Sequence, residues 1–378
     1  MNWSFRIARI AGIDLNIHIT MLLMLPLGAL LWGGPNPSLN GALFGMLMVV
    51  LLFGSVLLHE LGHALTARAL DIPVREIQLL PLGGVAILGR PVLNPGQELL
   101  ITMMGPIVNV LIIIGLAIVA VVTGVFTRLT PDTVTSMFSA ISFDGAVLWL
   151  IQANLLLVLF NMIPAFPLDG GRMMRAMLAF VTNYRRATLV AATIGQGCAI
   201  LLGLWGLSNM NFLLLATALF IFLAARQEVA VTEAVTVLHD LKVADLLREQ
   251  PPALQVGQRV REAAELLRAE GLFAVAVLQG ERPLGIVTRP EIEALMHAGR
   301  GEVWITLAMR RELPSVAADA PLEAARLTMA EHDSPVVMAL EGTNFRGLIT
   351  LEDIAAAYAR HDGKPPQAPA SPSTSPSA

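Results

Sequence analysis

The sequence predicts a polytopic α-helical membrane protein with a membrane-associated β-hairpin, followed by a soluble α/β module. Three observations support this fold class. Hydrophobic residues make up 55% of the 378 residues, and charged residues only 14%. The charged residues gather after Gln227, and residues 240–360 contain an internal repeat with a period of about sixty residues. Two parts that suit different solvents therefore share one chain.

Six apolar stretches are long enough to cross a bilayer, which takes about 20 residues of helix. The first is not followed by the small-residue cleavage site of a secretory signal, so we expect it to remain as a span. The second and third are long enough to tilt or to project past the bilayer. The predicted spans are residues 17–33, 42–68, 97–123, 146–163, 187–207 and 210–226.

The distribution of arginines predicts the orientation, because cytoplasmic loops are enriched in positive charge. With six spans, one set of loops contains only Arg128. Both termini and the soluble module should therefore be cytoplasmic, in a multi-pass protein of a prokaryotic plasma membrane. The opposite set of loops contains Arg6, Arg9, Arg68, Arg75, Arg90, Arg172, Arg175, Arg185, Arg186 and Arg226.

A metal-binding pattern ends the second apolar run. Residues 59–63 read His59-Glu60-Leu61-Gly62-His63, directly after an uncharged stretch from residue 41 to residue 58. Histidines four residues apart share one face of a helix, so both imidazoles can reach one metal ion, and the glutamate can act as general base. Ionisable groups at membrane depth are costly and mark function. The pattern predicts zinc-dependent hydrolysis at the membrane.

A catalytic zinc ion usually has three protein ligands, and Asp169 is the best candidate for the third. It follows the fourth span on the side where the histidines lie, after the prolines Pro164 and Pro167. Gly170 and Gly171 should allow a sharp turn there. The alternative is that Asp169 caps the next helix.

Residues 74–88 predict a hairpin or re-entrant loop near the cytoplasmic surface, with two short apolar pieces around Pro81 and the glycines Gly83 and Gly84. Non-helical backbone at that depth must pack against protein or line a water-filled cavity. A plain surface loop is the alternative.

The soluble module repeats a helix–strand–strand–helix unit. Residues 285–292 match residues 347–354, and residues 260–267 match residues 321–328. The first strands of the two units are residues 274–278 and 335–340. The predicted organisation is a membrane domain, a linker, two repeats and a disordered tail rich in Pro, Ser and Ala. Their residues are 1–226, 227–239, 240–298, 299–361 and 362–378 respectively.

The membrane part resembles the site-2 proteases, a family of zinc intramembrane metalloproteases. The matching elements are residues 59–63, the segment from Asn161 to Gly171, residues 105–109 (Gly-Pro-Ile-Val-Asn) and Leu82-Gly83-Gly84. The resemblance implies that His59, His63 and Asp169 bind one zinc ion per chain. It also implies that Glu60 activates water, and that Asn161 steadies the substrate or the oxyanion.

The repeat resembles a pair of cystathionine β-synthase (CBS) motifs packed as one Bateman module. The resemblance implies a pocket for ATP, ADP or AMP formed by Thr288 with Glu291 and by Thr350 with Asp353. Glu291 departs from the aspartate usual at its position. Many such pairs serve only in dimerisation, so both nucleotide sensing and a homodimer through this module stay open.

The leading hypothesis is a zinc-dependent endopeptidase that cleaves transmembrane segments of membrane proteins within the lipid bilayer. The alternatives are a CBS-regulated transporter, which leaves the metal-binding residues unexplained, and a metal-binding pseudoprotease, which has no need of Glu60. No basic cluster with interleaved aromatic residues is present, so a nucleic-acid partner is not expected. The single cysteine, Cys198, excludes an intramolecular disulfide.

Overall fold

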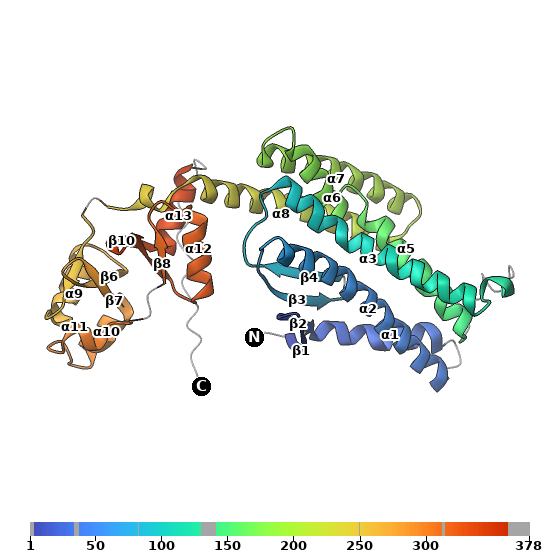
Figure 1. Cartoon of the computed structure of the whole chain (residues 1–378), viewed down its shortest axis with the longest axis horizontal. Coiled ribbons are helices and arrows are strands. Elements are labelled where there is room, and N and C mark those ends of the chain that lie inside the picture. Colours follow the sequence, from blue (N-terminus) through green and yellow to red (C-terminus); the bar gives the residue numbers. More distant parts are fainter. Residues whose placement is uncertain are drawn as a thin grey trace. The chain divides into compact units, whose positions relative to one another are not determined.

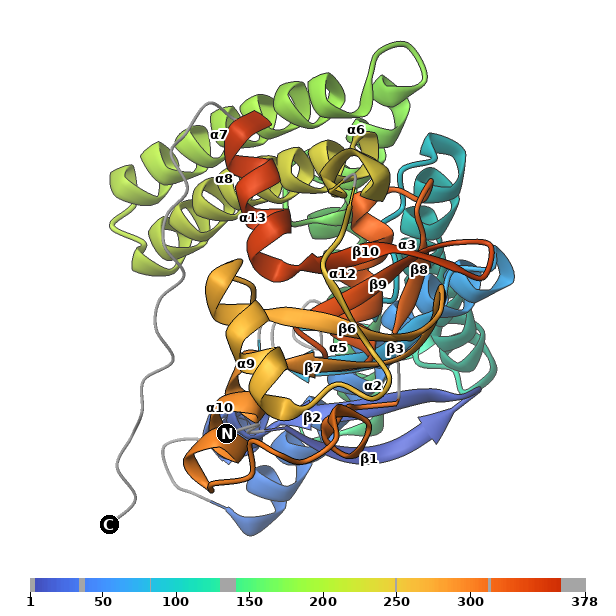
Figure 2. The same ribbon diagram turned by 90° about the vertical axis from the view of Figure 1, so that its left-hand side faces the viewer.

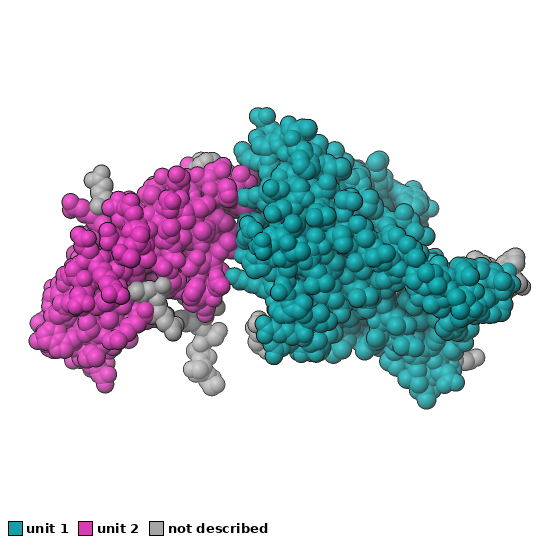
Figure 3. All heavy atoms as spheres, viewed as in Figure 1, with its two compact units in different colours: residues 1–232 teal, residues 233–378 magenta. Residues whose placement is uncertain are grey.

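The computed structural model describes residues 4–33, 38–81, 83–129, 141–248, 250–311 and 314–361. The predicted tail at residues 362–378 and Leu82 lie outside the described residues. The chain divides into two compact units, Met1–Thr232 and Glu233–Ala378, which Figure 3 distinguishes by colour. The division falls inside one helix, so the predicted linker at residues 227–239 is helical.

Among the described residues, five helices that begin in the first unit are long and apolar enough to cross a membrane. They contain 19 to 31 residues, which corresponds to about 28–46 Å at 1.5 Å per residue. Many of their large apolar side chains face outward, as expected for contact with lipid; Leu30 on the shorter α1 and Val122 on α3 are 74% and 80% exposed. These helices are α2 (Leu39–Ala69), α3 (Pro95–Val122), α5 (Phe143–Asn161), α7 (Tyr184–Ser208) and α8 (Phe212–Asp240).

The first predicted span is shorter than expected. Residues 17 and 18 end a strand, and the apolar helix that follows extends only over Ile19–Trp32, as the 3-10 turn η1 (Ile19–Leu23) and α1 (Met24–Gly33). Helix α1 packs against α2, where Gly28 and Gly45 bring the two backbones so close that neither position has room for a side chain. The fourth span ends at Asn161, and the short helix α6 (Asp169–Ala179) follows it.

A four-stranded sheet lies beside α2 (Figure 1). Its order is β1-β2-β3-β4, with β1 (Ser4–Ile10) antiparallel to β2 (Ile13–His18), and β2 parallel to β3 (Val74–Leu80). Strand β4 (Gly83–Leu88) pairs antiparallel with β3, with Leu80 opposite Gly83, so the predicted hairpin is confirmed. Ile13 and Ile77 are fully buried in a core that also contains Leu61 and Ala64 of α2. The sheet thus covers the end of α2 that carries the histidines.

The second unit contains two copies of the predicted helix–strand–strand–helix repeat. A short parallel strand completes the sheet of each copy. Fully buried Val275 and Val337 in the central strands anchor the two cores. Figure 2 shows the two copies from the side. The first copy comprises β5 (Ala253–Gln255), α9 (Val260–Ala269), β6 (Ala274–Gln279), β7 (Arg282–Thr288) and α10 (Arg289–His297). The second comprises β8 (Ser315–Ala317), α12 (Leu322–Glu331), β9 (Val336–Glu341), β10 (Asn344–Thr350) and α13 (Leu351–His361).

Candidate metal centre

Three ligand atoms from α2 and α6 converge inside the first unit. The Nε2 atoms of His59 and His63 are 3.1 Å apart, and Oδ2 of Asp169 lies 3.1 Å from the first and 3.2 Å from the second. A tetrahedral zinc ion with bonds of about 2.0–2.1 Å separates its ligand atoms by about 3.3–3.4 Å. The triangle therefore fits zinc after a small widening, and an ion bound to it keeps a fourth position open.

Hydrogen bonds on the far side of each imidazole prepare these nitrogens for a metal. Nδ1 of His59 lies 2.5 Å from Oδ1 of Asn109, and Nδ1 of His63 lies 2.8 Å from the carbonyl oxygen of Ile101. Both partners are acceptors, since the Asn109 amide directs its Nδ2 to Asn154, so each Nδ1 donates and each Nε2 keeps its lone pair. Oδ2 of Asp169 is buried and makes no hydrogen bond. A proton could bridge one pair of these atoms, whereas a divalent cation contacts all three.

The support of His59 continues through a chain of buried polar side chains. Nδ2 of Asn109 donates to Oδ1 of Asn154 at 2.8 Å, and Nδ2 of Asn154 donates to Oγ of Ser55 at 3.2 Å. Asn109 and Asn154 are fully buried. From the sequence, Asn109 is named only as part of the matching segment 105–109, and neither asparagine is connected with His59. The signal that could have found them is polar residues within otherwise apolar spans.

Close packing of α3 on α2 shapes the centre. A side chain at Gly105 would collide with the rings of both His63 and His59, and one at Gly62 would collide with the carbonyl group of Met104. Gly105 thus allows a close approach, and the two imidazoles occupy the space that a side chain would fill.

Asp169 is the first residue of α6, and the helix cap is Leu168, whose side chain makes no capping bond. The N-cap alternative for Asp169 is therefore wrong. Gly170 and Gly171 do not form a sharp turn, because both are helical. They are needed because side chains there would collide with the backbone of residues 162–166, which crosses the start of α6.

Glu60 and Asn161 have different neighbours in the structure. Glu60 is half-buried on α2 beside the hairpin, and a side chain at Gly84 of β4 would collide with it. Asn161 ends α5, and its Nδ2 donates to the carbonyl oxygen of Leu157 at 3.0 Å. Within the described part of the chain, no hydrogen bond joins Asn161 to the three ligand residues.

In the second unit, the two predicted nucleotide pairs have unequal surroundings. Thr350 donates its hydroxyl to Asp353 at 2.7 Å, and both line a cavity of about 140 Å³ together with Arg248, Phe273 and Glu352. In the other pair, Glu291 accepts from the Thr288 hydroxyl at 2.7 Å.

Glu291 has an additional partner, since the Arg310 guanidinium donates to its other carboxylate oxygen. Burial alone would raise the pKa of Glu291, but the hydrogen bonds from Thr288 and the pairing with Arg310 lower it below its usual value. The Glu291 carboxylate is therefore already paired with Thr288 and Arg310.

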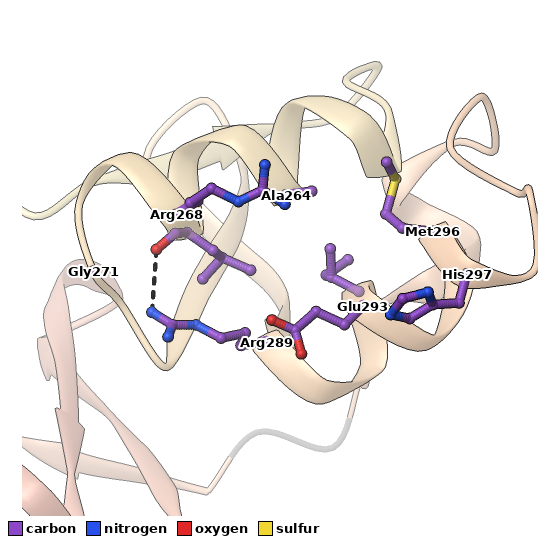
Figure 4. Close-up of a pocket in the computed structure, with 9 residues that line it drawn as sticks. Ala264, Arg268, Gly271, Arg289, Glu293, Met296 and His297 are labelled. Carbon is purple, nitrogen blue, oxygen red and sulfur yellow. Dashed lines mark hydrogen bonds between the residues drawn. The ribbon is translucent and has the colours of Figure 1, made fainter.

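A separate cavity of about 300 Å³ lies between α9 and α10 (Figure 4). Arg268 and Glu293 line it, and Arg289 points across it and donates to the carbonyl oxygen of Leu267 at 3.3 Å. None of the four predicted nucleotide residues lines this cavity.

A polytopic membrane fold with a buried His–His–Asp centre defines a membrane metallohydrolase. The family model of peptidase family M50 matches residues 47–204, and the CBS domain model matches residues 243–297 and 301–360. A zinc metalloprotease of Methanocaldococcus jannaschii is 32% identical over 94% of this chain and 96% of its own length. The chain therefore belongs to peptidase family M50, the site-2 protease family, as a metalloprotease with C-terminal CBS domains.

Two further relatives match smaller shares of the chain. Stage IV sporulation protein FB of Bacillus subtilis is 25% identical over 49% of this chain and 58% of its own length. The solved site-2 protease from Methanocaldococcus jannaschii is 36% identical and covers 60% of this chain and 95% of the solved chain, with a TM-score of 0.43.

Proposed function

We propose that this chain is a zinc-dependent intramembrane endopeptidase that cleaves transmembrane segments of other membrane proteins. The observation that carries the proposal is the convergence of His59, His63 and Asp169 at one end of a membrane-spanning helix. Membership in a metalloprotease family supports the same reaction. A CBS-regulated transporter has no use for this centre.

The roles of the residues follow from their chemistry. A zinc ion held by His59, His63 and Asp169 supplies a Lewis acid that polarises a carbonyl group and lowers the pKa of a bound water to about 7. Glu60 accepts the proton of the attacking water and returns it to the leaving amine. Asn109 holds the His59 ring in the tautomer that a metal requires. We keep Asn161 as a candidate for contact with the substrate.

The hairpin offers a way to hold the substrate extended. A helical peptide bond is hidden behind its own hydrogen bonds, so the cleaved segment must unwind. Strand β4 is the last strand of the four-stranded sheet, and its Gly84 lies against Glu60. An extended substrate segment that pairs with β4 is thereby brought next to the general base.

Metal content of the detergent-purified protein tests the centre without a substrate. We expect about one zinc per chain in the wild type and in Glu60→Gln, and loss of zinc in Asp169→Ala. With a single-span test protein, Glu60→Gln should slow cleavage by about 10²–10⁴-fold, the usual contribution of a general base. Zinc that survives Asp169→Ala would reject the third ligand. Zinc-loaded wild type that cleaves none of a panel of single-span proteins would support a pseudoprotease.

Val85→Pro tests the strand edge, because proline removes a backbone donor and disfavours pairing. Val85→Thr is the matched control, since it keeps the backbone N–H and suits a strand. We expect Val85→Pro to keep its zinc and lose cleavage, and Val85→Thr to retain both. Equal cleavage by the two variants would exclude pairing with β4.

We also propose that an adenine nucleotide regulates the protease through the cavity that contains Thr350 and Asp353. At about 140 Å³ the cavity is smaller than the ~300–1,000 Å³ typical of ligand sites, so binding must widen it. Calorimetry with ATP, ADP and AMP should show binding that Asp353→Asn weakens and Glu291→Gln leaves unchanged. Absence of heat with all three nucleotides would leave dimerisation as the role of the module.

The cytoplasmic position of both termini, in a prokaryotic plasma membrane, remains part of the proposal. The excess of arginine in one set of loops supports it when the shorter helix Ile19–Trp32 counts as a sixth span beside the five longer ones, and Arg175 is left out because it is buried in α6. Labelling of single cysteines placed in the second unit, in intact and permeabilised cells, tests this orientation.

A further inference from the structure

Arg175 is a buried cation that the metal centre does not use. Its side chain lies in α6 and is 7% exposed. Its Nε donates to Oε1 of Glu98 in α3 at 2.9 Å, and its Nη1 donates to Oε1 of Glu228 in α8 at 2.6 Å. Thr232 of α8 lies 3.4 Å from the same Nη1. One guanidinium therefore joins α6 to both α3 and α8.

The same guanidinium packs on the turn that leads to Asp169. It lies 5.0 Å from the ring centre of Phe166, a fully buried residue three positions before Asp169. A side chain at Gly171 would collide with the backbone of Ala165 and Phe166, so this turn and the first turn of α6 fit tightly together. Arg175 is therefore in contact with the turn that leads to Asp169.

The two carboxylates around Arg175 differ in their surroundings. The side chain of Glu98 is 6% exposed, whereas the side chain of Glu228 is 25% exposed. Buried ion pairs often add little stability compared with apolar packing, so their retention calls for another role. Glu228 stands on α8, the helix that continues to Asp240, beyond the last residue of the first unit.

We propose that Arg175 is a positioning residue for Asp169, and that its bond to Glu228 makes the metal centre respond to the position of α8. This inference rests on the metal centre proposed above. Arg175 is suited to the role because its planar fork can hold Glu98 and Glu228 at once, which the single ammonium of a lysine cannot do with the same geometry.

The test compares Glu228→Gln with wild type in the full-length, Co²⁺-loaded protein. The visible absorption of Co²⁺ reports ligand geometry, and a chelator measures the rate of metal release. We expect an altered cobalt spectrum and roughly tenfold faster release, because loss of an outer partner typically weakens metal binding 10–100-fold. Asp144→Asn is the matched control, since it breaks the Arg128–Asp144 pair without touching α6 or α8.

A second variant separates positioning from general stability. Thr232→Val removes the weaker of the two contacts between Arg175 and α8 and keeps Glu228, so it should change release in the same direction by a smaller factor. A Glu228→Gln protein with wild-type spectrum and release rate overturns the proposal, even if its melting temperature is lower. If the wild type binds neither Co²⁺ nor Zn²⁺, the metal centre itself fails, and this inference fails with it.

Discussion

At the scale of single residues, the chain from His59 through Asn109 and Asn154 to Ser55 shows how buried polar groups can prepare a ligand. Each unpaired polar group in an apolar interior is costly, and here each one satisfies the next. In this series of hydrogen bonds, Asn109 fixes a proton on Nδ1 of His59, which leaves Nε2 free to bind a metal. The histidines are therefore oriented before a metal arrives.

Asn109→Ala should weaken zinc binding by about 10–100-fold, because His59 loses the acceptor that holds its ring. Ser55→Ala, at the far end of the same chain, should have a much smaller effect. Competition with a zinc-binding dye measures both affinities. Equal affinities in the two variants would show that the chain does not support the ligand.

Glu291 provides a prediction about pH in the second unit. The pKa of Glu291 is lower in the folded than in the unfolded protein. The ionised side chain therefore stabilises the fold fully at pH values above the pKa of the unfolded protein, near 4.5. This contribution to stability is lost as the pH falls through the lower pKa that Glu291 has in the folded protein. The melting temperature of the wild type should therefore drop between about pH 5 and pH 3 more steeply than that of Glu291→Gln. Parallel curves for the two proteins would contradict this assignment.

At the scale of elements, the approach of α3 to α2 leaves room for two imidazoles only because Gly105 has no side chain. Gly105→Ala should displace His63 and abolish stoichiometric zinc. Gly115→Ala, two to three turns further along the same helix, meets no atom within 4 Å and should bind zinc like the wild type. Metal analysis of both variants is the measurement, and zinc retained in Gly105→Ala would show that the helices can separate there.

The sequence predicts elements well where one physical signal dominates. Long apolar runs predicted α2, α3, α5, α7 and α8, and the repeat predicted the central strands of the second unit. Strand β2 was missed, although Ile13, Leu15 and Ile17 alternate with polar residues, because the apolar run that follows was extended back to residue 17. The short strands β5 and β8 have three residues each, too few for a periodic pattern.

The structure brings together the three candidate ligands, and local spacing defines two of them. His59 and His63 share a helix face by periodicity alone. Asp169 is predicted as the third ligand because it lies at the same membrane depth as the histidines. The partners Asn109, Asn154 and Ile101 come from other helices, and only tertiary packing brings them together. The burial of Arg175 likewise depends on α3 and α8, so the sequence assigned it to a loop.

At the scale of the whole molecule, the chain contains two units with separate hydrophobic cores. Multidomain proteins often unfold in more than one step. Free zinc at a concentration of 1,000 times its dissociation constant would raise the free energy of unfolding of the first unit by about 4 kcal/mol. A strong chelator should therefore lower one melting transition and leave the other unchanged, and Asp169→Ala should show the lower value with or without chelator. One transition that shifts as a whole would show that the units unfold together.

The distribution of the ligands over α2 and α6 also has a consequence for biosynthesis. The ribosome completes α3 and α5 after the two histidines and before the carboxylate. A partly made chain can hold His59 and His63 in the membrane, but it lacks the third ligand until α6 is inserted. The ligand set is thus complete once α6 has been made, while α7 and α8 are still to follow.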